Sequence, residues 1–129
     1  MSKNLEIFNR YNEALIAGDF PAVFDTMADD IIWHQPGNHT ISGTVVGKEK
    51  LGVHLATFGQ KTNGTFKVLT NWVSDNKDLV AAHVTFLGTR PDGVELNMSG
   101  IDLFRIENGK IQEVWLFSSD QATEDAFWG

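Results

Sequence analysis

The sequence predicts an α+β fold, in which a curved antiparallel sheet wraps around three helices as a cone and leaves an apolar pocket inside. Three observations support this prediction. Apolar residues recur at helical spacing in three early stretches, four later stretches alternate between apolar and polar residues, and the 129 residues are 42% hydrophobic. A chain of this size and composition suits one domain over residues 1–129. The expected order of elements is α-α-β-β-α-β-β-β-β.

The helices are expected early in the chain, where a suitable first residue precedes each apolar pattern. Ser2 is suited to cap a helix over residues 3–17, which a glycine then ends. Asp19 is suited to cap a second helix, whose apolar stripe extends to Met27. A third helix is expected over residues 47–59. The first two helices are therefore predicted to form a hairpin.

The strands are predicted from β-rich segments that turn residues separate. The first covers residues 31–35, and a short edge strand is expected within residues 37–46. Four further strands form an antiparallel meander joined by turn sequences, at residues 66–74, 79–88, 94–106 and 111–118. The polar tail from residue 120 is expected either to be disordered or to lay its aromatic residues over the mouth of the pocket.

Asp102 is a lone carboxylate on the more apolar face of the longest predicted strand. With a side-chain period of two, it shares that face with Met98, Phe104 and Ile106. A carboxylate in such a place needs a hydrogen-bond partner, a proton, or a cavity that admits water or ligand. Asp102 is therefore either a structural aspartate bonded within the core or a ligand-facing aspartate with a perturbed pKa.

Composition and spacing exclude several classes of partner and cofactor. The net charge of −7 and the lack of clustered Lys and Arg argue against nucleic acid or an anionic membrane. The chain has no cysteine, no apolar stretch near the roughly 20 residues that span a bilayer, and no signal-peptide pattern. No glycine-rich loop suggests a nucleotide, and no metal-site spacing relates the four histidines, His34, His39, His54 and His83. We therefore expect a cytoplasmic protein without metal or cofactor.

The last predicted strand is apolar on both faces, with Trp115 and Phe117 on one face and Val114 and Leu116 on the other. A strand of this kind is covered on both sides. The helices cover one side, and we expect a second copy of the chain to cover the other. This predicts a homodimer through the sheet with Trp115 and Phe117 in the interface.

Four stretches carry a family resemblance: RYNEALIAGD (10–19), ADDIIWHQPG (28–37), SGTVVGKEKL (42–51) and IDLFRIENGKIQEVW (101–115). In this order they resemble the nuclear transport factor 2-like superfamily, in its SnoaL-like polyketide cyclase and ketosteroid isomerase branch. The superfamily contains isomerases, cyclases, dehydratases, hydrolases and non-catalytic binders, so the resemblance implies the fold more strongly than a reaction.

The resemblance implies roles for individual residues. Tyr11 is similar to the tyrosine that donates a hydrogen bond to the substrate oxyanion in the isomerases. Asp102 is similar either to the protonated aspartate of that oxyanion hole or to the acid/base aspartate of the cyclases. Gln35 stands where the isomerases place their aspartate base, and Gly100 where the epoxide hydrolases of the superfamily place an arginine. Both positions depart from those two patterns.

We therefore predict a cofactor-independent isomerase or cyclase that moves a proton next to a carbonyl group of an apolar, polyketide- or steroid-like substrate. The alternative is a non-catalytic ligand-binding or dimerisation module. The expected catalytic residues are Asp102, Tyr11 and His83. If the turn between the strands at 79–88 and 94–106 has two central residues, His83 lies opposite Gly100, on the Asp102 face. The other interpretation of His83 is a structural histidine. The expected substrate-binding residues are Gln35, Trp33, Met98, Phe104, Val114, Leu116 and Ser118.

Overall fold

A computed structural model describes residues 2–129, which form four helices and a six-stranded sheet. The elements in chain order are α1 (Lys3–Ala17), α2 (Phe20–Asp25), β1 (Met27–Gln35), β2 (Gly43–Val46), α3 (Lys48–Lys61), β3 (Lys67–Asn76), β4 (Leu79–Thr89), β5 (Glu95–Glu107), β6 (Lys110–Ser118) and α4 (Gln121–Trp128). The predicted α+β class and the predicted order of the first nine elements are confirmed. A fourth helix, which was not predicted, follows them.

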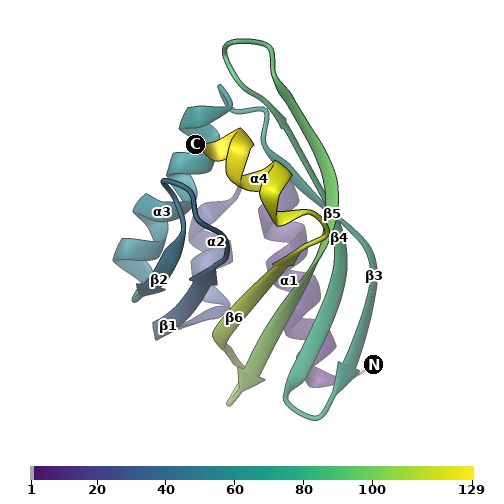
Figure 1. Cartoon of the computed structure of the whole chain (residues 1–129). Coiled ribbons are helices and arrows are strands. Elements are labelled where there is room, and N and C mark those ends of the chain that lie inside the picture. Colours follow the sequence, from purple (N-terminus) through teal and green to yellow (C-terminus); the bar gives the residue numbers. More distant parts are fainter. Residues whose placement is uncertain (1) are drawn as a thin grey trace.

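The strands form one curved sheet in the order β2-β1-β6-β5-β4-β3. Neighbouring strands are antiparallel except that β1 runs parallel to β6. Figure 1 shows α1 and α2 behind the sheet, α3 beside β1 and β2, and the yellow α4 close to the end of β6. The helices therefore cover one face of the sheet and its β1–β2 side, as the predicted cone requires.

Local capping explains both N-terminal helices. The Ser2 side chain accepts a hydrogen bond from the Leu5 N–H, and Gly18 ends α1 in a left-handed conformation with a φ of 70°. Asp19 caps α2 in the same way by accepting from the Ala22 N–H. The predicted helix over residues 3–17 is confirmed with these bounds.

The second helix is shorter, and the first strand longer, than predicted. The helical pattern placed Met27 in the second helix, but α2 ends at Asp25 and β1 begins at Met27. Thr26 closes the helix by donating a hydrogen bond of 2.7 Å from its hydroxyl to the Val23 carbonyl. Met27 then pairs with Ile111 of β6. Pairing with a distant strand here overrides the local helical pattern.

Two apolar clusters form the core. The larger packs the buried face of α1 against the sheet and includes Phe8 and Phe104. The smaller joins α3, β5 and α4 through Phe58, Leu96, Phe127 and Trp128. The Trp128 ring meets Phe58 edge-on, with 4.9 Å between ring centroids. The tail is therefore ordered, and both of its aromatic residues are buried in the smaller cluster. No helix within residues 2–129 is long and apolar enough to cross a membrane.

Candidate active site

A cavity of about 1200 Å³ lies inside the cone. Residues of every helix and strand except β2 contribute to its mostly apolar wall. Its polar lining includes four side chains from four elements: Tyr11 of α1, Gln35 of β1, Asp102 of β5 and Glu124 of α4. A cavity of this size is large enough for a polycyclic small molecule. Within residues 2–129, no group of three or more His, Asp or Glu side chains is arranged to hold a metal ion.

Tyr11 lies on the buried face of α1, where the residue is only 5% exposed. Its ring packs edge-on against Phe104 of β5, with 5.2 Å between ring centroids, and tilts against Phe8. Burial, followed by the negative charge of Asp102, raises the pKa of Tyr11 well above its usual value. The phenol is therefore neutral at physiological pH and keeps its proton for a hydrogen bond.

Asp102 borders the cavity from the middle of β5, between Ala82 of β4 and Leu116 of β6. Burial raises the pKa of Asp102 to about 7, and the charge of Glu124 is the second cause. No group within the described chain donates a hydrogen bond to this carboxylate. The side chain stays partly exposed because it borders the cavity, although protein surrounds it. A structural aspartate bonded within the core does not fit this geometry.

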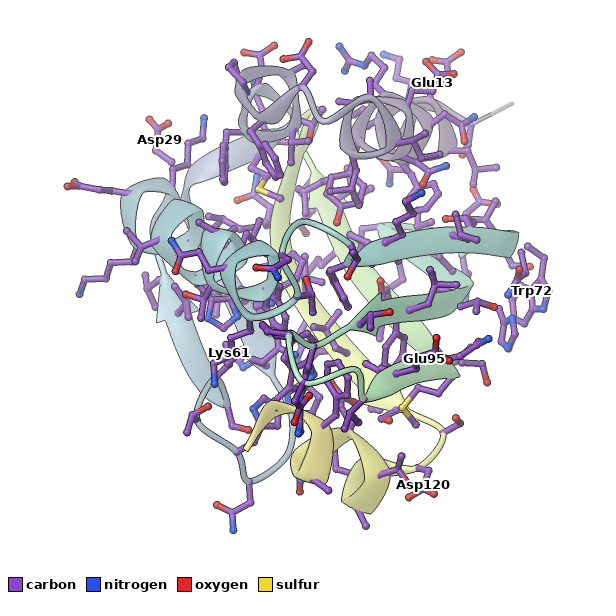
Figure 2. All side chains as sticks on the ribbon, turned by 90° about the horizontal axis from the view of Figure 1, so that it is seen from above. Glu13, Asp29, Lys61, Trp72, Glu95 and Asp120 are labelled. Carbon is purple, nitrogen blue, oxygen red and sulfur yellow. The ribbon has the colours of Figure 1, made fainter. Side chains whose placement is uncertain are left out.

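Glu124 is a second carboxylate at the cavity, and it was not predicted. The residue is 5% exposed, and burial raises its pKa. Its helix, α4, is capped by Asp120, whose side chain accepts a hydrogen bond from the Thr123 N–H. Figure 2 labels Asp120 at this end of the molecule. The sequence does contain a signal, since a capping aspartate precedes Glu124, Phe127 and Trp128 at helical spacing.

Gln35, at the end of β1, is held by two other side chains. Trp33 Nε1 donates a hydrogen bond of 3.0 Å to Gln35 Oε1, and His54 Nε2 of α3 lies 3.1 Å from the same oxygen. Gln35 is 7% exposed and borders the cavity. Burial, followed by the positive charge of His39, lowers the pKa of His54. His54 was not a predicted site residue, because nothing in the spacing of the histidines relates it to Gln35.

The prediction that His83 shares the Asp102 face is wrong. His83 pairs with Ile101 rather than with Gly100, because the turn between β4 and β5 is one residue longer than assumed. A shift of one residue moves a side chain to the other face of a sheet. The His83 ring stacks on the exposed Trp72, with 5.4 Å between centroids. Figure 2 shows Trp72 projecting away from the interior of the molecule.

The predicted substrate-binding residues divide into two groups. Four of them border the cavity: Trp33, Gln35, Leu116 and Ser118. Three do not: Met98, Phe104 and Val114. Phe104 and Val114 are buried in the larger core cluster, and Met98 packs against the smaller one. Strand parity identifies the inward face correctly, but it does not distinguish a position that borders a cavity from one that fills the core.

The chain is similar to one family and to several solved structures. A family model described as "SnoaL-like domain" matches residues 8–114. A protein of unknown function with a cystatin-like fold from Xanthomonas campestris is 42% identical, with a TM-score of 0.92 and 98% of each chain covered. An NTF2-like protein of unknown function from Burkholderia pseudomallei is 18% identical, with a TM-score of 0.89 and coverage of 99% and 98%. A putative SnoaL-like polyketide cyclase from Jannaschia sp. is 18% identical, with a TM-score of 0.79 and coverage of 98% and 92%. No curated protein matches the sequence.

Proposed function

This chain belongs to the SnoaL-like domain family, and we propose that it is a cofactor-independent enzyme of the isomerase or cyclase type. Its reaction moves a proton at the carbon next to a carbonyl group of an apolar small molecule. The observation that carries the proposal is Asp102, a carboxylate of near-neutral pKa that borders a large, mostly apolar cavity. The name of the Jannaschia structure, a putative polyketide cyclase, agrees with this class of reaction.

Asp102 is the proton carrier in this proposal. A general base works best when its pKa lies near the operating pH, because it is then ionised often enough to accept a proton and still basic enough to hold it. With a pKa of about 7, Asp102 meets this condition at neutral pH. Once protonated, the same carboxyl group returns the proton to another carbon or to an oxygen of the substrate.

Tyr11 stabilises the charge that this proton transfer creates. Loss of a proton next to a carbonyl puts negative charge on the carbonyl oxygen, and a neutral hydroxyl held in an apolar site stabilises it as a hydrogen-bond donor. The raised pKa of Tyr11 keeps its proton in place. Edge-on packing against Phe104 limits the movement of the ring. Tyr11 therefore serves as the oxyanion donor.

Glu124 raises the pKa of the base. Burial raises the pKa of Glu124, and the charge of its ionised carboxylate raises the pKa of Asp102. Asp102 is therefore the carboxyl group that gains and loses a proton near neutral pH, so it is an acceptor before the proton transfer and a donor after it. An intramolecular ring closure or a proton shift along a substrate requires both.

Deuterium exchange tests the proposal without knowledge of the natural substrate. The protein is incubated in D₂O with a panel of polycyclic ketones and 1,3-diketones, and deuterium incorporation next to the carbonyl is followed by mass spectrometry. We expect catalysed exchange to fall about a hundredfold or more in both Asp102→Asn and Asp102→Ala, because neither variant has the base. Asp75→Asn, at an exposed position on β3, is the matched control and should exchange like the unmodified protein.

Two outcomes would contradict this assignment. An Asp102→Asn variant that keeps most of the activity would show that Asp102 works as a hydrogen-bond donor and that the base lies elsewhere. Compounds that bind without any catalysed exchange would favour the alternative, a non-catalytic ligand-binding module. The observation that favours the alternative is Gln35, because it occupies the position at which the isomerases carry their base.

A further inference from the structure

We propose that His54 is a positioning residue, which together with Trp33 fixes the Gln35 carboxamide so that its NH₂ group donates a hydrogen bond to a carbonyl or oxyanion oxygen of the ligand. The inference rests on the proposed function only in taking the cavity as the ligand site. It replaces the predicted partner His83, which lies on the other face of the sheet, with a histidine of α3. It also assigns a binding role to the residue that stands where the isomerases have a base.

The orientation of the amide follows from the chemistry of its partner. An indole N–H can only donate a hydrogen bond, so the atom 3.0 Å from Trp33 Nε1 must be the amide oxygen of Gln35 and not its nitrogen. His54 Nε2 lies 3.1 Å from the same oxygen. An amide oxygen only accepts, so His54 Nε2 must carry a hydrogen. The two contacts therefore specify both the amide orientation and the histidine tautomer.

The histidine itself is held by its surroundings. Its ring meets Phe58 edge-on, with 5.3 Å between centroids, and half-burial on α3 restricts its rotation. Burial and the neighbouring His39 keep the pKa of His54 below its usual value, so the ring is neutral at physiological pH. A neutral ring with a hydrogen on Nε2 has none on Nδ1. The hydrogen bond to Gln35 thus selects one of two tautomers.

The NH₂ group of Gln35 is left for the ligand. Gln35 is 93% shielded from solvent, and within residues 2–129 no hydrogen bond joins its Nε2 atom to an acceptor. A donor in a mostly apolar cavity is unfavourable until an acceptor reaches it. The two hydrogen bonds accepted by Oε1 also polarise the amide and strengthen its N–H groups as donors. Gln35 is therefore a preorganised donor of the kind that stabilises a developing oxyanion.

The assignment defines a class of ligand. An aspartate at this position would repel an oxygen that carries negative charge, whereas the amide of Gln35 attracts it. The ligand should therefore present a ketone, enolate or carboxylate oxygen to Gln35, and an apolar body to the rest of the cavity. An ammonium group or another donor at this point would find no acceptor, because Oε1 is already occupied by Trp33 and His54.

The first test needs no ligand. In ¹⁵N-labelled protein, the imidazole nitrogen resonances of His54 should show a hydrogen on Nε2 and none on Nδ1 near neutral pH. Gln35→Leu removes the acceptor, and the preference for this tautomer should then relax. A His54 ring with its hydrogen on Nδ1 in the unmodified protein would overturn the proposal.

The second test uses a matched pair of rigid probes, 9-fluorenone and fluorene, which carry a carbonyl group and a methylene group, respectively, at the same ring position. The unmodified protein should bind fluorenone roughly tenfold more tightly, the value of one net hydrogen bond, and the carbonyl stretching frequency of bound fluorenone should fall. Gln35→Leu should remove the larger part of the preference. His54→Leu should reduce it severalfold while fluorene affinity stays within about twofold, because the donor is still present but no longer held in position. Trp33→Phe should also reduce the ratio of fluorenone affinity to fluorene affinity, although Trp33 borders the cavity and its replacement changes both affinities.

Controls separate this proposal from the proposed function. Tyr11→Phe should retain part of the preference, and a preference lost only in Tyr11→Phe would assign the donor to Tyr11 and overturn the role of Gln35. Asp75→Asn, at an exposed position on β3, should retain the preference. Because the assay measures binding and not proton transfer, an intact preference in a protein that shows no deuterium exchange would refute the proposed function and leave this assignment standing. A protein that binds neither probe, or both equally, would contradict the assigned class of ligand. Thermal unfolding of each variant confirms that it is folded.

Discussion

Replacing Glu124 with glutamine removes the smaller of the two causes that raise the pKa of Asp102. The pKa of Asp102 is raised from 3.8 to about 7. Burial is the larger cause, and the charge of Glu124 is the smaller one. The smaller of two causes accounts for at most half of the rise. Glu124→Gln should therefore lower the pKa of Asp102 by no more than roughly 1.5, which corresponds to about 2 kcal/mol of interaction between the two carboxylates. Because burial remains, the pKa should stay above 5.

Carboxyl ¹³C NMR of aspartate-labelled protein measures this shift directly as a function of pH. The matched control is Glu13→Gln on the exposed side of α1, which should leave the titration of Asp102 unchanged. In the exchange assay, Glu124→Gln should move the acidic limb of the pH–rate profile to lower pH. An Asp102 pKa that stays the same or rises in Glu124→Gln would refute the coupling. A pKa near 4 in the unmodified protein would refute the burial argument as well.

Three further predictions concern stability and assembly. Because the folded pKa of Asp102 lies above the unfolded value, the folded state binds more protons between about pH 4 and pH 7, and stability is lost as pH rises through this range. Asp102→Asn should therefore raise the free energy of unfolding at pH 8 by up to about 4 kcal/mol and leave it unchanged at pH 3; urea denaturation showing a loss at pH 8 would contradict this. Gly100→Ala would place a Cβ 2.2 Å from the Phe117 carbonyl oxygen, so it should destabilise the fold by about 2 kcal/mol or more, and an equal urea midpoint would contradict the close approach. Trp115 and the 54% exposed Phe117 should lie in a homodimer interface through the sheet, and a clean monomer at micromolar concentration in sedimentation would contradict it.

The sequence predicts those parts of the fold that depend on local chemistry. Helix α1 has the predicted bounds because its cap at Ser2, its apolar spacing and its ending at Gly18 are all encoded within the helix itself. The inward position of Asp102 was also predictable, since side-chain direction along β5 follows from a period of two. These features need no knowledge of distant contacts.

The sequence-based predictions are wrong or incomplete where contacts between segments far apart in the chain determine the structure. The face occupied by His83 depends on the length of one turn, and a single residue in that turn reverses it. Met27 lies in a strand because β6, more than 80 residues later, pairs with it. The contact between His54 and Gln35 joins α3 to β1, and no pattern in either element alone indicates it. The cavity itself forms only when nine elements come together.

The C-terminal helix makes the chemistry of the cavity separable from the stability of the fold. Its eight residues supply the Glu124 carboxylate together with Phe127 and Trp128, yet none of them belongs to the larger core cluster around Phe104. Glu124 borders the cavity, so a substitution at this position changes the charge of the cavity while the larger cluster stays intact. In the laboratory, Glu124 is therefore the position of this helix at which directed evolution would alter the cavity directly.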